Sequence, residues 1–583
     1  MLQTKAFSSY FILSFHNIGC TSGIKTKASF YFVFRSVCTI FAHTIIERKI
    51  MKYPIGIQSF DQIREEGYVY VDKTALVYDL VSKGKIYFLS RPRRFGKSLL
   101  LSTLKHYFLG HKELFKGLAI DALEKDWHEY PVFHVDFNGE NFTKHGALEQ
   151  KLNKYIGEWE QIYGVNPLES TLGSRFQGVI NRAHQQTGQR VVVLIDEYDK
   201  PILDVLDTDA SYADESDNRI LLEDDHRNIL KGFYSTFKAA DADLRFVMLT
   251  GVTKFSQVSV FSGFNQPKDI SMDERYEALC GMTKEELESV FAESIQELAE
   301  KYRVDVAEMK QMLRLQYDGY HFSPAMKDIY NPFSLLNAFD MRMLRDYWFA
   351  SGTPTYLIRL LSHSNEQINE LTGKYYDVSE FIDYKADVER PLPMIYQSGY
   401  LTIKDYDEST ESFLLDFPNN EVRKGFLSLI ASSYLKNTEE RPEGWVRDAF
   451  RQLNRGDVEP FCESLTAFLA SIPYDSHDAL KDIKATEKHF QYTFYLLLRL
   501  IGVYCRAIKV EDRQSYGRVD CTLEMKEYVY IFELKMDGSA DEALQQIEQK
   551  GYAKPYATDP RHLIRIGMNF SSQTRTIAEW KCQ

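Results

Sequence analysis

The chain has 583 residues, enough for two to four domains that each bury a core. Its formal net charge of −13 excludes a general attraction to nucleic acid, and its 37 tyrosines and 38 phenylalanines exclude a disordered chain. The seven cysteines are scattered without a Cys-x-x-Cys pair, so the pattern gives no zinc site or disulfide framework and favours the cytoplasm.

Residues 1–50 differ in composition from the rest, with one acid, Glu47, against six lysines and arginines. The apolar run over 28–46 is compatible with a membrane anchor, and the composition is compatible with a transit peptide. Globular patterning begins at Met51. We therefore expect 1–50 to be a non-conforming extension that the native protein lacks, and we expect no membrane partner.

The stretch 86–104 predicts a strand, a tight turn and a helix. The turn ends in Gly96-Lys97-Ser98, as in a P-loop, where backbone N–H groups cradle phosphates. Lys97 would then reach the β- and γ-phosphates, and the Ser98 hydroxyl would ligate Mg²⁺. Arg91 stands where the general motif has its first glycine, so a plain basic turn is the alternative.

A second motif supports the first. Residues 190–202 read RVVVLIDEYDKPI, which predicts a fully buried parallel strand that ends in two acids. Asp196 would hold Mg²⁺ and Glu197 would activate the attacking water. A buried strand that ends in exposed acids is the alternative, but the pair of motifs predicts an ATP site.

Further strands are predicted over 131–137 and 244–250, and helices over 148–163 and 176–186. The acidic stretch 207–225 predicts a mobile surface insertion. The strand over 244–250 would lie beside the P-loop strand and place a polar sensor near the γ-phosphate. Thr250 and Thr253 are the candidates, and capping of a turn is the alternative.

The middle of the chain predicts helices. Residues 282–345 have helical spacing typical of a small lid, and 392–417 predict a helix followed by a β-hairpin. A connector is favoured for the latter over a winged-helix module that binds DNA. Residues 426–472 are again helical, with a loop predicted at 442–444.

From residue 486 the pattern predicts an αβββαβ domain. A strand over 528–535 places Val529, Ile531, Glu533 and Lys535 on one face, and Asp520 lies on the preceding strand. Buried acids and a lysine in this pattern suit Mg²⁺-dependent cleavage of phosphodiesters: Asp520 and Glu533 hold the metal, and Lys535 orients water or stabilises charge. A salt-bridged strand is the alternative.

Several strings resemble a bacterial AAA-ATPase-like family with a C-terminal PD-(D/E)xK nuclease-like domain. They include YVDKT (70–74), RPRRFGKS, LIDEYDKPI and TGVTKFSQVSVFSGFN, and later YDGYHF and YQSGYLTI. The resemblance implies an arginine-rich P-loop without the first glycine. It also implies that Glu487 is an additional helix carboxylate and metal ligand, and that Gln546 and Tyr552 are polar positions of the following helix.

We expect ATP to be held by the loop, by the first helical turn and by the sensor, namely Arg93, Arg94, Phe95, Gly96, Lys97, Ser98, Leu99 and Thr250. Arg93 and Arg94 either add charge at the phosphates or anchor the loop on neighbouring acids. The expected metal ligands are Ser98 and Asp196 in one site and Glu487, Asp520 and Glu533 in the other. Catalysis is expected from Glu197, Asp520, Glu533 and Lys535.

The predicted fold is α/β: an AAA/STAND-like P-loop core, a helical middle and a restriction-endonuclease-like C-terminal domain. Its expected parts are 51–275 (ATPase), 276–430 (lid and connector), 431–485 (helical linker) and 486–583 (nuclease-like). The predicted function is an ATPase coupled to a Mg²⁺-dependent nuclease acting on DNA or RNA. The alternative is an ATP-switched sensor or interaction protein whose nuclease-like domain binds without cleaving. A homo-oligomer is an open expectation.

Overall fold

The computed structural model describes residues 51–583 except 215, 256–266, 353–355, 358–370, 383–390, 435–441, 472–482, 515–516 and 575. The expected extension over 1–50 lies outside the described residues. In the part of the chain that is described, no helix combines the length and apolar character needed to cross a membrane.

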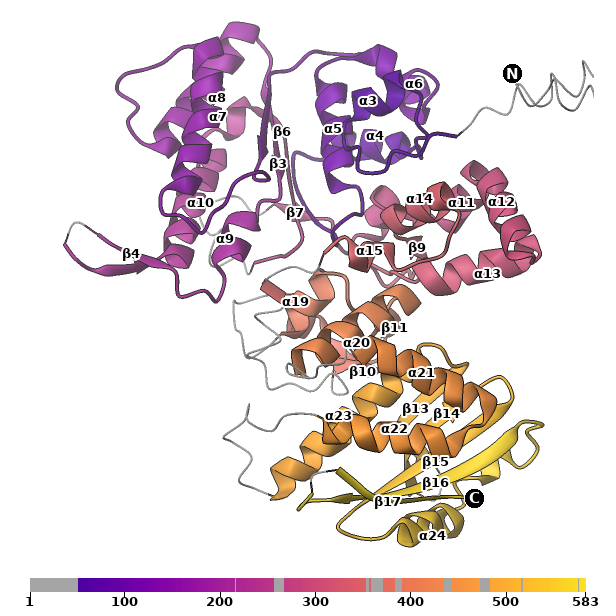
Figure 1. Ribbon diagram of the computed structural model, residues 1–583. Helices are drawn as coiled ribbons and strands as arrows, with labels where there is room; N and C mark the ends of the chain where they lie inside the picture. The colour runs from indigo at the N-terminus through magenta and orange to yellow at the C-terminus, as the bar shows by residue number, and fades with distance from the viewer. Residues whose placement is uncertain are drawn as a thin grey trace, which may run out of the picture. The chain divides into compact units, whose positions relative to one another are not determined.

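A parallel five-stranded sheet forms the core of the N-terminal half, in the order β2-β3-β6-β1-β7 (Figure 1). β6 pairs with β1 on one side and with β3 on the other, which confirms the predicted strand beside the P-loop strand. Both strands that carry motifs therefore end at the same edge, where ligands of such sheets bind. The strands are β1 (Ile86–Ser90), β2 (Val132–Asp136), β3 (Val191–Asp196), β6 (Leu244–Gly251) and β7 (Lys268–Asp269).

Helices cover both faces of this sheet, which explains why every residue of β3 is buried. One face is covered by α7 (Ala147–Tyr163), α8 (Leu172–Thr187) and α10 (Leu222–Ala239). On the other side lie α3 (Phe60–Glu65), α4 (Thr74–Lys83), α5 (Lys97–Phe108) and α6 (Ala119–Leu123). Stacked rings fill the first interface: Phe133 and Trp159 have centroids 4.3 Å apart.

The predicted surface insertion over 207–225 contains regular structure that the sequence did not predict. Two short strands, β4 (Ser211–Ala213) and β5 (Arg219–Leu221), form an antiparallel hairpin. The last three acids, 223–225, lie in the first turn of α10, where the helix dipole favours negative charge. The sequence did not predict the start of this helix, because a run of acids is also typical of a solvated loop.

The middle region contains the predicted helices. They are α11 (Lys284–Val290), α12 (Ala292–Tyr302), α13 (Val306–Tyr317), α14 (Pro332–Met341) and α15 (Tyr347–Ala350). A two-stranded sheet, which the sequence did not predict, pairs β8 (Met282–Thr283) at the start of this region with β9 (Ile329–Tyr330) between α13 and α14.

The predicted helix and hairpin over 392–417 are present as α19 (Leu392–Gln397), β11 (Thr402–Asp407) and β12 (Ser412–Asp416). A third strand, β10 (Lys374–Asp377), extends the hairpin on its β12 side and is followed by α18 (Val378–Phe381).

Three helices follow: α20 (Asn420–Tyr434), α21 (Pro442–Arg455) and α22 (Val458–Ala470). The loop predicted at 442–444 is wrong, because Pro442 opens α21. Proline is favoured in a first helical turn, where its missing N–H costs nothing.

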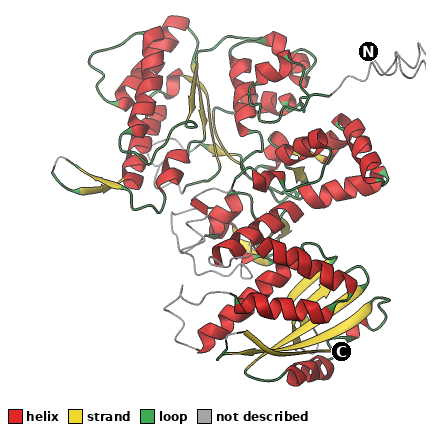
Figure 2. Cartoon of the chain, viewed as in Figure 1, coloured by secondary structure: helices red, strands yellow, loops and turns green. Residues whose placement is uncertain are grey.

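The C-terminal domain is a five-stranded mixed sheet in the order β13-β14-β15-β16-β17 (Figure 2). β15 and β16 are parallel and the other pairs are antiparallel. The predicted αβββαβ order is confirmed, and β17 adds a final strand. The elements are α23 (Ile483–Gly502), β13 (Ala507–Gln514), β14 (Gly517–Glu524), β15 (Tyr528–Met536), α24 (Ala540–Lys550), β16 (His562–Ser571) and β17 (Thr576–Cys582).

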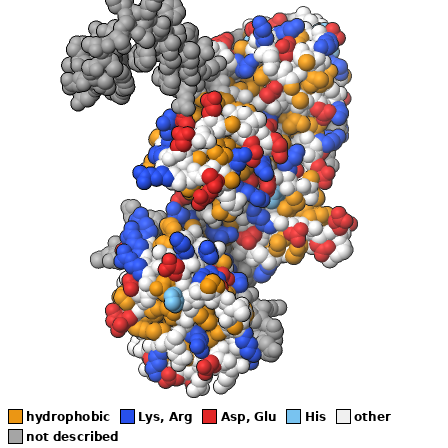
Figure 3. Space-filling view, turned by 90° about the vertical axis from the view of Figure 1, so that its right-hand side faces the viewer, with side chains coloured by type: hydrophobic (Ala, Val, Ile, Leu, Met, Phe, Trp, Pro, Cys, Tyr) orange, Lys and Arg blue, Asp and Glu red, His pale blue; other side chains and the backbone are white. Residues whose placement is uncertain are grey.

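On the face shown in Figure 3, acidic and basic side chains are interspersed over most of the surface. This agrees with the absence of a general positive charge that the composition implies.

Candidate active sites

The P-loop turn is built around two left-handed backbone positions. Gly96, with φ of 94°, precedes the first residue of α5, and Arg94 has φ of 67°. Glycine adopts this region without a steric cost, whereas arginine does so only when its surroundings hold it there. The turn therefore presents the start of α5 to the sheet edge, with Lys97 as its first residue.

The Lys97 side chain lies inside this turn and is only 4% exposed. Its Nζ donates to the backbone carbonyls of Arg91 at 3.0 Å and Pro92 at 3.3 Å. The same Nζ lies 3.9 Å from Oε1 of Glu197. The predicted phosphate-binding lysine and the predicted base are thus adjacent, although 100 residues separate them in the sequence.

Glu197 follows β3 in the left-handed region, with φ of 52°. Burial raises the pKa of its carboxyl to about 7, while Lys97 acts in the opposite direction and Asp199, Asp196 and Asp136 add to the increase. A carboxyl with a pKa near the working pH is suited to accept a proton from water. Strained backbone positions of this kind cluster at functional sites.

Thr250 contacts the other predicted acid. Its hydroxyl donates to Oδ1 of Asp196 at 2.7 Å, and the Glu197 N–H donates to the same oxygen at 3.1 Å. Thr250 and Asp196 are 0% and 2% exposed. In this structure Thr250 orients Asp196, and it is not among the residues that line the cavity at the P-loop.

The sequence did not single out Asp199, which organises the end of β6. Its Oδ2 accepts from the N–H groups of Val252 at 2.9 Å and Thr253 at 2.6 Å, and from the Thr253 hydroxyl at 2.7 Å. Thr253 is thus held by Asp199. The available signal was the position of this aspartate, three residues after the end of a buried strand in IDEYDKPI.

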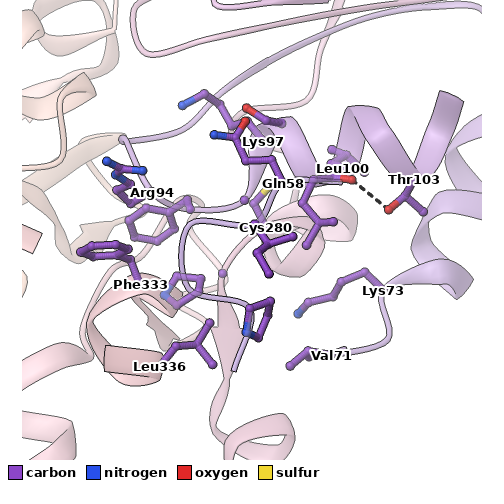
Figure 4. Close-up of a pocket in the computed structure, with 18 of the residues that line it drawn as sticks. Gln58, Val71, Lys73, Arg94, Lys97, Leu100, Thr103, Cys280, Phe333 and Leu336 are labelled. Atoms are coloured by element: carbon purple, nitrogen blue, oxygen red, sulfur yellow. Dashed lines mark hydrogen bonds between the residues drawn. The ribbon is translucent and has the colours of Figure 1, made fainter. Parts of the chain in front are cut away.

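A cavity of about 480 Å³ opens at the P-loop (Figure 4). The loop and first helical turn contribute Arg93 to Leu100, so every predicted loop residue lines it. Asp136 and Glu197 line it from the sheet edge. The walls away from the sheet are mainly apolar and include Ile55, Ile57, Val69, Val71, Phe333 and Leu336.

Lys73, from the YVDKT string, lines the same cavity and forms an ion pair with Glu286 at 2.5 Å. Glu286 also completes a capping box at the start of α11, so this pair joins the start of α4 to α11. Lys73 was part of the resemblance but was given no role, and only the fold brings it to the cavity.

The two loop arginines contact the middle region. The Arg93 guanidinium donates to the carbonyl of Gly352, and the Arg93 carbonyl accepts from the indole N–H of Trp348 at 3.0 Å. The Arg94 guanidinium lies over the Phe333 ring, 5.1 Å from its centroid. Within the described residues, the partners that hold these two arginines are therefore a backbone carbonyl for Arg93 and an aromatic ring for Arg94, and not the neighbouring acids that the second alternative expected.

The predicted C-terminal residues also converge. Asp520 on β14 accepts the N–H of Leu534 at 2.8 Å, which places it beside Glu533 on β15. Lys535 Nζ lies 3.9 Å from Glu533 Oε1. Gln546 on α24 joins both, because its amide N–H donates to Glu533 and its oxygen accepts from Lys535 Nζ at 2.5 Å.

Glu533 is 1% exposed, and burial raises its pKa to about 8; Asp520 adds to the increase and Lys535 opposes it. Its Oε2 is buried without a hydrogen-bond partner. An orphaned carboxylate oxygen beside a second acid fits a divalent cation. Among the side chains described, no three acids, histidines or cysteines converge. Glu487 lies on α23, but its side chain is outside the description.

Tyr552 is 1% exposed and packs with Val529, Ile531 and Ile547 in the small core between the sheet and α24. This confirms the alternation predicted for β15, in which Val529 and Ile531 share a face.

Comparison with known proteins identifies the domains that carry these residues. Residues 54–261 match a model described as a predicted AAA-ATPase, and residues 485–580 match the PD-(D/E)XK nuclease superfamily. The "Uncharacterized protein in vnfD 5'region" of Azotobacter chroococcum mcd 1 is 37% identical over 542 residues, which cover 90% of this chain and 98% of that protein. The chain belongs to the AAA-ATPase-like family.

This AAA-ATPase-like protein therefore has the fold class that its sequence predicted: a P-loop-type parallel sheet, a helical middle and a C-terminal α/β domain of the nuclease superfamily. The Aeropyrum pernix ORC1 protein, solved in complex with DNA, matches over 61% of this chain and 92% of its own, at 9% identity and a TM-score of 0.22. A TM-score this low carries no argument.

Proposed function

We propose that this protein binds and hydrolyses ATP at the P-loop cavity, and that its C-terminal domain cleaves nucleic acid with the help of Mg²⁺. The observation that carries the first part is the 3.9 Å approach of Lys97 to Glu197 at the edge of a 480 Å³ cavity. A cation for phosphate and a carboxyl that can accept a proton from water are two of the groups that ATP hydrolysis uses.

The residues divide the work at the ATP site. Lys97 exchanges its two loop carbonyls for phosphate oxygens, and the backbone N–H groups at the start of α5 bind the same phosphates. Ser98 and Asp196 hold Mg²⁺, which neutralises phosphate charge when bound. Glu197 takes the proton of the attacking water. The apolar wall that includes Ile57, Phe333 and Leu336 is suited to the base.

At the C-terminal site, Asp520 and Glu533 hold the metal, with Glu487 as the proposed third carboxylate. A bound Mg²⁺ polarises the scissile phosphate and lowers the pKa of its water. Gln546 fixes the Glu533 carboxylate, and it also holds Lys535 beside the place where negative charge develops. The orphaned Glu533 Oε2 supports a metal at this position.

The test of the nuclease part uses the full chain with Mg²⁺ or Mn²⁺, ATP, and single- and double-stranded DNA and RNA. Cleavage that Asp520→Ala abolishes supports it. Saturable binding without cleavage, unchanged by Asp520→Ala, would favour the alternative of an ATP-switched binding protein. Cleavage that persists in Asp520→Ala would contradict the assignment of the site.

The expected division at residues 51, 276, 431 and 486 stays a proposal. So does self-association of the ATPase, which size-exclusion chromatography with and without ATP would test.

A further inference from the structure

A second cavity, of about 290 Å³, adjoins the end of the P-loop strand β1 and the first residues of the loop. Its lining shares no residue with the 480 Å³ cavity. Ser90, Arg91 and Pro92 contribute from the end of β1 and the loop, Lys254 and Asp269 from the sheet edge, and Ser271 and Met272 from the segment after β7. The rest of the lining comes from the middle region. We call it the back cavity.

Arg91 is the feature of the back cavity that calls for a ligand. The residue is 1% exposed, so its guanidinium has lost almost all contact with water. Its Nη1 donates to the carbonyls of Ser90 at 2.9 Å and Ser271 at 2.7 Å. One face of the guanidinium lies over the Phe322 ring, 4.1 Å from the centroid.

The other edge of the same guanidinium has no partner. Nε and Nη2 are buried and make no hydrogen bond, and in the described part of the chain no acid forms an ion pair with Arg91. Stacking on Phe322 uses the face and leaves the edge free. The Nε–Nη2 edge is the fork that binds the two oxygens of an oxyanion side by side. A buried, unpaired charged donor is costly, and an anion offsets that cost.

The other charges around the cavity limit the charge of that anion. Lys254 forms an ion pair with Asp269 at 2.9 Å, so its charge is already matched. The nearby Glu277 carboxylate accepts from Phe322 N–H at 3.2 Å and from the Ser323 hydroxyl at 2.9 Å. Arg91 alone offers an unused edge, which suits a singly charged anion better than a phosphate dianion.

The remaining walls are mainly apolar or aromatic, and their larger polar side chains, His321, Gln397 and Thr402, hydrogen-bond within the protein. Met272, Ile382, Tyr396 and Leu401 line the cavity beside Arg91. A volume of about 290 Å³ is at the small end of ligand pockets. Ser379 lines the cavity at an exposed position of α18, which offers a way in.

We propose that the back cavity binds a small organic monocarboxylate, with its carboxylate on the Nε–Nη2 edge of Arg91 and its apolar body against Met272, Ile382 and Leu401. This site is independent of the proposed ATP hydrolysis. The residue that would bind the carboxylate is connected to the nucleotide site, because the backbone carbonyl of Arg91 accepts a hydrogen bond from Lys97 Nζ.

The test is calorimetric titration of the full chain with acetate, benzoate, phenylacetate and inorganic phosphate. Benzoate and phenylacetate should bind saturably, roughly tenfold or more tighter than acetate, because the cavity buries their rings. Arg91→Lys should weaken benzoate binding by roughly tenfold or more, since lysine keeps the charge but lacks the fork.

Two further variants keep the test decisive. Ser379→Trp fills the exposed rim without disturbing the core and should weaken benzoate binding even if Arg91→Lys folds poorly. Arg245→Lys changes another arginine over aromatic rings, 6.0 Å from the Phe108 centroid and outside the cavity lining, and should leave benzoate affinity unchanged. The proposal is overturned if neither benzoate nor phenylacetate binds with a Kd below about 10 mM. It is equally overturned if phosphate binds as tightly, or if Arg91→Lys and Ser379→Trp both bind benzoate like the unmodified protein.

Discussion

The indole Nε1 of Trp348 donates a 3.0 Å hydrogen bond to the backbone carbonyl of Arg93, so a helix of the middle region holds the P-loop directly. The backbone N–H of Trp348 in turn donates to Oε1 of Glu421 at 2.6 Å, and the Ser334 hydroxyl donates to Oε2 of Glu421 at 2.8 Å. Ser334 lies on α14 next to Phe333, which lines the ATP cavity. The loop and the apolar wall are thus joined by one buried hydrogen-bond network.

This network predicts that Trp348→Phe weakens ATP binding by a few-fold, because it keeps an aromatic ring and removes only the N–H that fixes the loop. Titration with a fluorescent ATP analogue measures the effect. Trp445→Phe is the matched control, since the Trp445 indole donates to the Ser464 carbonyl at 3.2 Å, far along the chain from the P-loop. Equal affinities for the two variants would show that the Arg93 contact does not position the loop.

Glu421 predicts a pH dependence of stability. Burial raises its pKa to about 8, above the ordinary value for an unfolded chain. Between these values the folded state binds more protons than the unfolded state, so stability falls as pH rises from about 5 to 8. Glu421→Gln removes this loss, because an amide can accept from Trp348 and donate to Ser334. Melting temperatures from pH 5 to 9 should therefore decline less in the variant, and parallel curves would contradict the prediction.

Thr250 and Thr253 are predicted to differ in their effects. Thr250→Val removes the hydroxyl that orients Asp196 and should lower ATP hydrolysis by roughly tenfold at saturating ATP. Thr253→Val removes a hydrogen bond to Asp199 and should cost about 1 kcal/mol of stability with little change in rate. Phosphate release and urea unfolding of both variants separate the two roles, and an exchange of the two effects would refute the assignment.

Glu533 is predicted to be needed for cleavage but to lower the stability of the metal-free protein. Glu533→Gln removes a buried carboxylate with one unpartnered oxygen, so the metal-free protein should melt at a higher temperature. The same change should abolish cleavage, since an amide binds Mg²⁺ poorly. The measurements are calorimetry in EDTA and a nuclease assay with Mg²⁺. A lower melting temperature would mean that the carboxylate is structurally required.

Strong local patterns predicted most of the fold. The run VVVLID, rich in β-branched residues, favours a buried strand, and the alternation over Val529, Ile531 and Glu533 predicts one face of β15. Errors arose where local chemistry has two uses. Pro442 is a turn signal within a loop and a good first residue of a helix, and the acids at 223–225 suit both a solvated loop and the start of α10.

The candidate sites were predicted only as far as the motifs extend. Lys97, Glu197 and Asp520 stand in recognisable strings, but the walls formed by Phe333 and Lys73 depend on how distant segments fold together. The back cavity could not be predicted at all. In the sequence, Arg91 is only a departure from the P-loop motif. The fold alone shows that Phe322 stacks on one face of its guanidinium and that the Nε–Nη2 edge has no hydrogen-bond partner.

The most direct test of ATP hydrolysis at the P-loop compares ATP binding and phosphate release in the unmodified chain, Lys97→Ala and Glu197→Gln. The account predicts that Lys97→Ala loses affinity and hydrolysis together, because the phosphates lose their cation. Glu197→Gln should bind ATP at least as tightly as the unmodified chain, since it removes negative charge. Its rate of ATP hydrolysis should fall by roughly 100-fold or more. Undiminished phosphate release by Glu197→Gln would contradict the account.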